Sequence, residues 1–127
     1  LELCQFCFGP GLLYGVSDMV ELLNAATGWS TTLWEIMQVG ERRINLMRMF
    51  NIREGFTSED DDLPARIFEP LQGGLTEGNR IERREFEKAK KEYYEMMGWC
   101  PCTGIPTELK LKELALEWIL EAKEDEK

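Results

Sequence analysis

Apolar side chains recur every three or four residues along most of this chain, the spacing that gathers them on one face of an α-helix. The pattern is found in four stretches, residues 18–28, 32–50, 86–98 and 107–119. No stretch of five or more residues alternates apolar and polar side chains, as a half-buried β-strand would. The sequence therefore predicts an all-α fold of four or five helices.

Short motifs mark the expected ends of the first two helices. Asp18 and Glu21 have the spacing of a helix start, and Gly28 is expected just beyond the last turn. Thr32 and Glu35 have the spacing of a capping box, in which a hydroxyl and a carboxylate each bind an otherwise free N–H group. The second helix is therefore expected to begin at Thr32.

The second helix is expected to be long and amphipathic. One face carries an apolar stripe, which consists of Leu33, Ile36, Met37, Gly40, Ile44, Met47 and Phe50. Gly40 in that stripe would allow another backbone to approach closely. Four charged residues lie largely off the stripe and are expected to face solvent or a partner: Glu41, Arg42, Arg43 and Arg48.

Residues 53–80 follow neither the helical nor the strand period. This stretch is interrupted by Pro64, Pro70, Gly73, Gly74 and Gly78, and it is too long for a plain connection in a compact domain. Such a segment is normally disordered or ordered by lying over another surface. With 127 residues the chain has the size of one domain. We therefore expect an irregular multi-helical domain, residues 1–127, with a long extended loop at about 53–80.

Composition excludes several classes of function. The chain has no histidine, which removes Ser-His and Cys-His nucleophile pairs and every histidine-ligated metal. A net charge of −9 argues against a nucleic-acid partner. No apolar run approaches the roughly 20 residues that span a bilayer, and no signal peptide is visible, so we expect a cytoplasmic protein without a membrane partner.

Charge is distributed unevenly along the chain. Residues 1–41 carry five acidic residues and no basic one. A sparsely charged, apolar segment of this kind is typical of a surface that faces other protein, and equally of the core of the domain itself. The sequence alone does not distinguish between these two interpretations.

Four cysteines occur in two close pairs, Cys4-x-x-Cys7 and Cys100-Pro-Cys102. A short turn can bring two thiolates at the first spacing to the same metal, so a shared zinc or iron–sulfur site is one hypothesis. The alternatives are four ordinary thiols or a disulfide. The second pair is tighter than the usual zinc knuckle.

Two other motifs lack the context that their chemistry needs. Gly9, Gly11 and Gly15 resemble a dinucleotide-binding loop, but no strand precedes them. The acidic run at residues 59–62 lacks the glycine and the glutamate of a calcium-binding loop, because Ala65 and Leu71 stand at those positions. A solvated loop with an Asx-type turn explains the acidic run better.

Seven short strings together resemble the C-terminal domain of the aldehyde ferredoxin oxidoreductase family. They are Thr27-Gly28-Trp29, Gly40-Glu41-Arg42, Asn45-Leu46-x-Arg48-x-Phe50-Asn51-x-Arg53-Glu54-Gly55-Phe56, Asp62-Leu63-Pro64-x-Arg66, Glu69-Pro70-Leu71, Tyr93-Tyr94-Glu95-x-x-Gly98-Trp99 and Gly104-Ile105-Pro106-Thr107. The resemblance extends to about Leu114. It implies an enzyme with a tungsten or molybdenum bis-pyranopterin and one 4Fe-4S cluster, which oxidises an aldehyde with water to a carboxylic acid and passes electrons to ferredoxin.

The resemblance also implies roles for two residues at the start of the chain. Family members take three cluster cysteines from the preceding region and the fourth from a D-x-x-G-L-C motif. Leu3-Cys4 matches the end of that motif, although Glu2 stands where the motif has glycine. Cys4 would then be a cluster ligand, and Leu3 would lie beside the pterin. Cys7, Cys100 and Cys102 receive no role.

The chain begins at Leu1 rather than methionine, and we expect it to be a piece of a larger enzyme. Its partners would be the remaining domains of that enzyme and ferredoxin. Alone it would bind neither cofactor and catalyse nothing. Two alternatives remain: a free-standing interaction or assembly domain without catalytic function, and a small metal-binding domain that uses all four cysteines.

Overall fold

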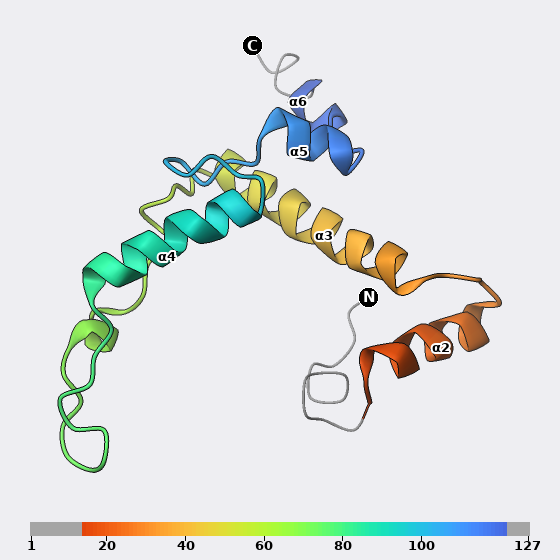
Figure 1. Ribbon diagram of the computed structural model, residues 1–127. Coiled ribbons are helices and arrows are strands. Elements are labelled where there is room, and N and C mark those ends of the chain that lie inside the picture. The colour runs from red at the N-terminus through yellow and green to blue at the C-terminus, as the bar shows by residue number, and fades with distance from the viewer. Residues whose placement is uncertain (1–13, 122–127) are drawn as a thin grey trace. The chain divides into compact units, whose positions relative to one another are not determined.

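The computed structural model describes residues 14–121, in which the chain forms five α-helices and one short 3-10 helix (Figure 1). The elements are α2 (Val16–Thr27), α3 (Leu33–Arg53), η1 (Ala65–Phe68), α4 (Arg83–Met96), α5 (Glu108–Glu113) and α6 (Trp118–Glu121). The β-type pairing in this range is an isolated bridge between Trp99 and Pro106. The all-α prediction is confirmed, and so is the long connection after α3, in which η1 is the helical element.

The chain divides into two compact units, with the boundary inside α3 after Asn45. The first unit contains α2 and the N-terminal part of α3. The second unit contains the C-terminal part of α3 and all later elements. Among residues 14–121, no helix combines the length and apolarity needed to cross a membrane.

In the first unit, α2 begins earlier than the sequence indicates. Gly15 is its N-cap, and the Asp18 carboxylate accepts a hydrogen bond from the Gly15 N–H at 2.7 Å. Asp18 is therefore the third residue of the helix rather than its cap. Gly28 ends the helix with φ +73°, and its N–H donates to the Asn24 carbonyl at 2.8 Å, as predicted.

The connection between α2 and α3 is fixed by local side-chain hydrogen bonds. The Asn24 amide donates to the Thr31 carbonyl at 2.9 Å and accepts from the Thr31 N–H at 2.8 Å. The predicted capping box is confirmed: the Thr32 N–H donates to the Glu35 carboxylate at 2.7 Å, and the Glu35 N–H donates to the Thr32 hydroxyl at 3.3 Å. The hydrogen bonds that the Thr32 N–H and hydroxyl donate to the carboxylate lower the pKa of Glu35.

The apolar core of the second unit lies between the C-terminal part of α3 and the last two helices. Its buried members are Met49, Leu111, Leu114 and Leu116, against which Ile52, Ile119 and Leu120 pack. Thr107 caps α5 by accepting a hydrogen bond from the Lys110 N–H. The second half of α3 therefore supports the end of the described chain.

The last predicted helical segment is interrupted at Ala115, which has φ +50°. Beyond the end of α5, the Leu116 N–H donates to the Leu111 carbonyl at 2.8 Å, and the Ala115 N–H donates to the Lys112 carbonyl at 3.0 Å. This hydrogen-bond pair is a Schellman motif with alanine in the left-handed position. The motif buries Leu111 and Leu116 together, which a continuous helix would not do.

Candidate functional site

The second unit holds a buried arginine at the centre of a polar cluster. Arg48 on α3 is only 8% exposed. Its guanidinium donates to both oxygens of Asp61, at 2.8 and 2.5 Å, and its Nε donates to the Gly104 carbonyl at 2.8 Å. The Tyr94 hydroxyl on α4 donates to the same carboxylate. The expectation that Arg48 faces solvent or a partner is therefore wrong, because its charge is satisfied inside the unit.

The Asp61 carboxylate and the Tyr94 phenol each keep one protonation state across the neutral pH range. Burial alone would raise the pKa of Asp61, but the hydrogen bonds from Arg48 and Tyr94 outweigh it and hold that pKa below its ordinary value. Burial, together with the hydrogen bond to Asp61, raises the pKa of Tyr94 to about 12. The carboxylate is therefore ionised and the phenol protonated across the neutral range.

Aromatic rings and a glycine complete the surroundings of the arginine. The guanidinium carbon lies 5.1 Å from the centre of the Trp99 ring and 5.7 Å from that of Tyr94. Gly104 has φ +67°, and a Cβ there would lie 2.8 Å from the Tyr94 ring and still closer to the Arg48 guanidinium. Only glycine fits this position without moving the cluster.

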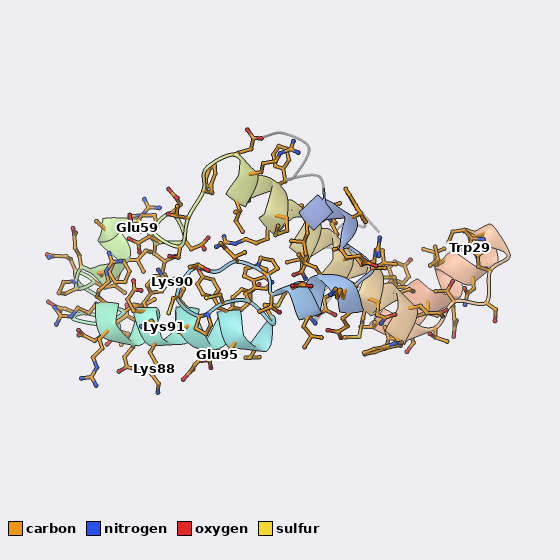
Figure 2. The ribbon with its side chains drawn as sticks, turned by 90° about the horizontal axis from the view of Figure 1, so that it is seen from above. Trp29, Glu59, Lys88, Lys90, Lys91 and Glu95 are labelled. Atoms are coloured by element: carbon orange, nitrogen blue, oxygen red, sulfur yellow. The ribbon has the colours of Figure 1, made fainter. Side chains whose placement is uncertain are left out.

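The acidic loop at residues 57–62 is held against α4. The Lys90 ammonium donates to the Ser58 carbonyl at 3.0 Å, and Arg83 pairs with Asp62 at 2.5 Å. Figure 2 shows Lys90 on the side of α4 that faces this loop, with Lys88 on the opposite side. Glu59, Asp60 and Asp62 are exposed, as expected of a solvated run, whereas Asp61 is half-buried by its contact with Arg48.

A second contact fixes the long connection to the start of α4. Arg83 also lies over the Phe68 ring, 3.8 Å from its centre, and Phe68 packs edge-on against Phe86 at 5.7 Å. The connection is thus ordered at residues 57–62 and at η1 by contacts within its own unit.

The polar cluster stabilises the fold but has no group free for chemistry. Every buried side-chain nitrogen and oxygen in the described part of the chain has a hydrogen-bond partner. Asp61 and Tyr94 hold each other in fixed protonation states, so neither is suited to proton transfer. The arrangement fixes the positions of α3, α4 and the turn that contains Gly104.

Most of the predicted apolar stripe on α3 is exposed. Ile36 is buried, but Trp34 beside the stripe is 64% exposed, and Met37 and Phe50 are 59% and 57% exposed. In the connection that precedes α3, Trp29 is 65% exposed (Figure 2). Gly40 has open space where a Cβ would lie, so no backbone approaches it closely within residues 14–121. The apolar face of α3 is therefore largely uncovered.

Cys100 and Cys102 lie in a turn between α4 and α5. Hydrogen bonds from the Thr103 hydroxyl and from the backbone N–H groups of Cys102 and Thr103 lower the pKa of the Cys100 thiol. Both cysteines are free thiols; Cys100 is half-buried and Cys102 is exposed. The structure therefore describes one of the two predicted pairs.

The residues that the sequence assigns to cofactors, Leu3 and Cys4, lie outside the described residues, as do Cys7, Gly9 and Gly11. Among residues 14–121, no three Cys, Asp or Glu side chains gather in an arrangement that could hold a metal ion. The assignment of Leu3 and Cys4 therefore stays a prediction.

Comparison with known families gives a match to most of the chain. Residues 1–116 match the family described as aldehyde ferredoxin oxidoreductase, domains 2 & 3. The chain is 37% identical over 119 residues to the tungsten-containing aldehyde ferredoxin oxidoreductase of Pyrococcus horikoshii, covering 92% of this chain and 19% of that protein. It is 38% identical over 104 residues to the protein of the same name from Pyrococcus furiosus, covering 80% and 16%.

A relative with another name matches almost as well. The aliphatic sulfonate oxidoreductase, WOR-like subunit, of Pyrococcus furiosus is 33% identical over 121 residues, covering 90% of this chain and 18% of that protein. The chain thus spans about a fifth of the length of these relatives or less.

A solved structure shares the fold. The active site complex BamBC of benzoyl coenzyme A reductase, in complex with 1,5-dienoyl-CoA, contains a chain that superimposes with a TM-score of 0.70 at 24% identity. The match covers 88% of this chain and 16% of the other.

Proposed function

The chain belongs to the aldehyde ferredoxin oxidoreductase family, and from that premise we propose that it works as the C-terminal part of an enzyme that oxidises an aldehyde with water to a carboxylic acid. The match over residues 1–116 carries this proposal. In such an enzyme a tungsten or molybdenum bis-pyranopterin supplies the oxidation chemistry, and a 4Fe-4S cluster supplies the route for electrons to ferredoxin.

The contribution proposed for this chain is one cluster ligand and part of the wall around the cofactors. Cys4 is the proposed ligand because Leu3-Cys4 matches the end of the family's D-x-x-G-L-C motif, and its thiolate is the soft anionic donor that an iron–sulfur cluster needs. Leu3 would lie beside the pterin. The remaining ligands and the substrate pocket would come from other domains, so the chain alone is proposed to be inactive.

The exposed apolar side chains of α3 support a partner that covers this helix. Trp34, Met37 and Phe50 are each more than half exposed, which is costly for a chain that works alone. The relatives are about five times as long as the matched region. The remaining domains of the same enzyme are therefore the partner that we propose for this surface.

The genomic sequence before the codon of Leu1 tests whether the chain is part of an enzyme. The proposal predicts an open reading frame that continues upstream and encodes a C-x-x-C-x-x-x-C motif, the source of three cluster ligands. A start codon at Leu1 would instead indicate a free-standing interaction domain and would contradict the proposal.

Paired cysteine variants test the ligand assignment. In the protein with all of its domains, Cys4→Ser is expected to abolish or alter the electron paramagnetic resonance signal of the reduced cluster. Cys7→Ser is the matched control, three residues away, and is expected to leave the signal unchanged. An unchanged signal in Cys4→Ser would contradict the assignment of Cys4.

A further inference from the structure

The first unit has almost no apolar core of its own. Within residues 14–45, Ile36 is the one buried apolar side chain, and α2 contains no buried residue. The apolar core cluster described above lies in the second unit. Six large apolar side chains of the first unit are at least half exposed: Tyr14, Val16, Leu22, Trp29, Trp34 and Met37. The burial of apolar surface that stabilises most folded units is therefore nearly absent here.

Local contacts determine where α2 begins and ends, but they stabilise it only weakly. With 12 residues, α2 is no longer than helices that are marginally stable in water when nothing packs against them. The hydrogen bonds between Asn24 and Thr31 fix the connection to α3, and Asp18 caps the first turn. Such contacts contribute much less to the stability of a helix than packing of its apolar face does. The apolar face of α2 therefore needs a surface to pack against.

The charge of the first unit indicates what kind of surface that is. The charged residues between positions 14 and 41 are Asp18, Glu21, Glu35 and Glu41, and the first basic residue is Arg42. A second copy of the chain in a symmetric contact would bring this acidic surface against itself, and like charges repel. An apolar surface with basic residues at its edge would complement it. Charge complementarity therefore favours a different partner over a second copy.

The length of the relatives indicates where such a partner comes from. The matched region is 19% of the Pyrococcus horikoshii protein, so most of that protein lies outside it. Gly40, on α3 within the first unit, has open space where a Cβ would lie. A glycine inside a helix lowers the stability of that helix, and the open space beside it allows a partner to approach closely. The remaining domains of the same enzyme are therefore the occupant that fits this surface.

We propose that α2 and the N-terminal part of α3 fold stably only when they dock on the remaining domains, against an apolar surface with basic residues at its edge. This inference rests on the proposed function and goes beyond it, because it makes the folding of the first unit depend on the partner. The second unit has its own apolar core and polar cluster and does not need the partner to fold. Order in α2 therefore reports whether the other domains are in place.

Amide hydrogen exchange, followed by mass spectrometry, tests this coupling in the 127-residue chain and in the protein with all of its domains. In the chain alone, α2 is expected to exchange within about tenfold of the rate of an unstructured peptide, whereas α4 is slowed more than about a hundredfold. In the whole protein, α2 is expected to be protected as strongly as α4. Strong protection of α2 in the chain alone would overturn the proposal, whether it is constant or appears as the chain concentration rises and a second copy binds.

Two pairs of variants of the whole protein test the chemistry of the contact. Leu22→Ser and Glu21→Lys, both at exposed positions on α2, are each expected to lower the protection of α2 at least about tenfold. The matched controls lie in the second unit: Leu75→Ser at a fully exposed position, and Glu95→Lys on α4 (Figure 2). The controls are expected to leave the protection of α2 unchanged. Equal effects of variant and control in either pair would contradict the proposed surface.

The measurement depends on neither the cofactors nor the activity, so it separates this inference from the proposed function. Rapid exchange of α2 in the whole protein would overturn the inference and would leave the enzyme assignment standing. A start codon at Leu1 would overturn the enzyme assignment, and the partner named here would fall with it.

Discussion

Arg48 shows how a single residue can organise a unit of this size. A buried guanidinium is costly unless its donors are paired, and here a carboxylate, a backbone carbonyl and two aromatic rings surround it. Its partners Asp61 and Gly104 lie 13 and 56 positions further along the chain. Periodicity on α3 cannot reveal such partners, which explains why the sequence placed Arg48 toward solvent. The resemblance motifs contained Arg48, Tyr94 and Gly104 but missed Asp61.

Removing the charge of Asp61 tests the polar cluster. Asp61→Asn leaves Arg48 buried without its counter-charge and is expected to lower the free energy of unfolding by about 2 kcal/mol, a value discounted because Asp61 is 33% exposed. Glu59→Gln, an exposed position two residues earlier, is the matched control and is expected to change it by less than about 0.5 kcal/mol (Figure 2). Urea denaturation of the chain measures both, and equal effects would contradict the assigned role.

The ion pair between Arg48 and Asp61 also predicts how the free energy of unfolding depends on pH. The folded-state pKa of Asp61 lies below its ordinary value of 3.8, so the ionised carboxylate contributes stability that is fully present above pH 3.8. That contribution is lost as the pH falls through the lowered pKa. The stability difference between the native chain and Asp61→Asn is therefore expected to be constant near neutral pH and to shrink below pH 3.8. Urea titrations at several pH values measure it, and a difference that grows on acidification would contradict the sign.

Glycine is needed at position 104 for two reasons, its left-handed backbone conformation and the lack of space for a Cβ, and substitutions can separate them. Gly104→Ala adds a methyl group that collides with Arg48 and Tyr94 at a backbone position with φ +67°. Gly73→Ala has φ +73° and open space, so it measures the cost of the left-handed conformation alone, about 1 kcal/mol. Gly104→Ala is expected to cost at least about 2 kcal/mol more in thermal or urea unfolding. If Gly104→Ala and Gly73→Ala lowered the free energy of unfolding equally, the polar cluster would be shown to accommodate the added methyl group at no cost.

At the scale of helices and turns, the features that the sequence predicted correctly depend on local contacts. Thr32 with Glu35 and the left-handed Gly28 involve residues within four positions of each other, and the structure confirms both. The start of α2 was predicted three residues late, because Asp18 binds the N–H of Gly15 rather than capping the helix itself. The break at Ala115 was missed, because alanine is a strong helix former and only the packing of Leu111 on Leu116 favours the turn.

Replacing alanine by glycine is expected to change the free energy of unfolding in opposite directions at two positions, one in the turn after α5 and one inside α4. Ala115→Gly relieves the left-handed strain at φ +50° and is expected to raise the free energy of unfolding by about 1 kcal/mol. Ala89→Gly, at an exposed position inside α4, is expected to lower it by about the same amount. Thermal unfolding of the two variants compares them directly. A destabilised Ala115→Gly would show that the Schellman turn does not limit stability.

At the scale of the whole molecule, the described residues form a scaffold that presents an uncovered helix. The proposal that other domains of the same enzyme cover α3 accounts for the exposure of Trp34, Met37 and Phe50. For residues 1–41 the sequence left open whether they form the core or face other protein, and the exposure of Trp34 and Met37 favours the second interpretation. Which residues touch a cofactor stays a prediction, because Leu3 and Cys4 lie outside the described residues.

The most direct test of the central proposal is the metal content of the purified 127-residue chain after anaerobic incubation with ferrous iron and sulfide. Because Cys4 is proposed as one ligand among four, elemental analysis is expected to find far less than one cluster or zinc ion per chain after gel filtration. One tightly held cluster or metal ion per chain, lost on changing Cys7 or Cys100, would contradict the proposal and would favour a self-contained metal-binding domain.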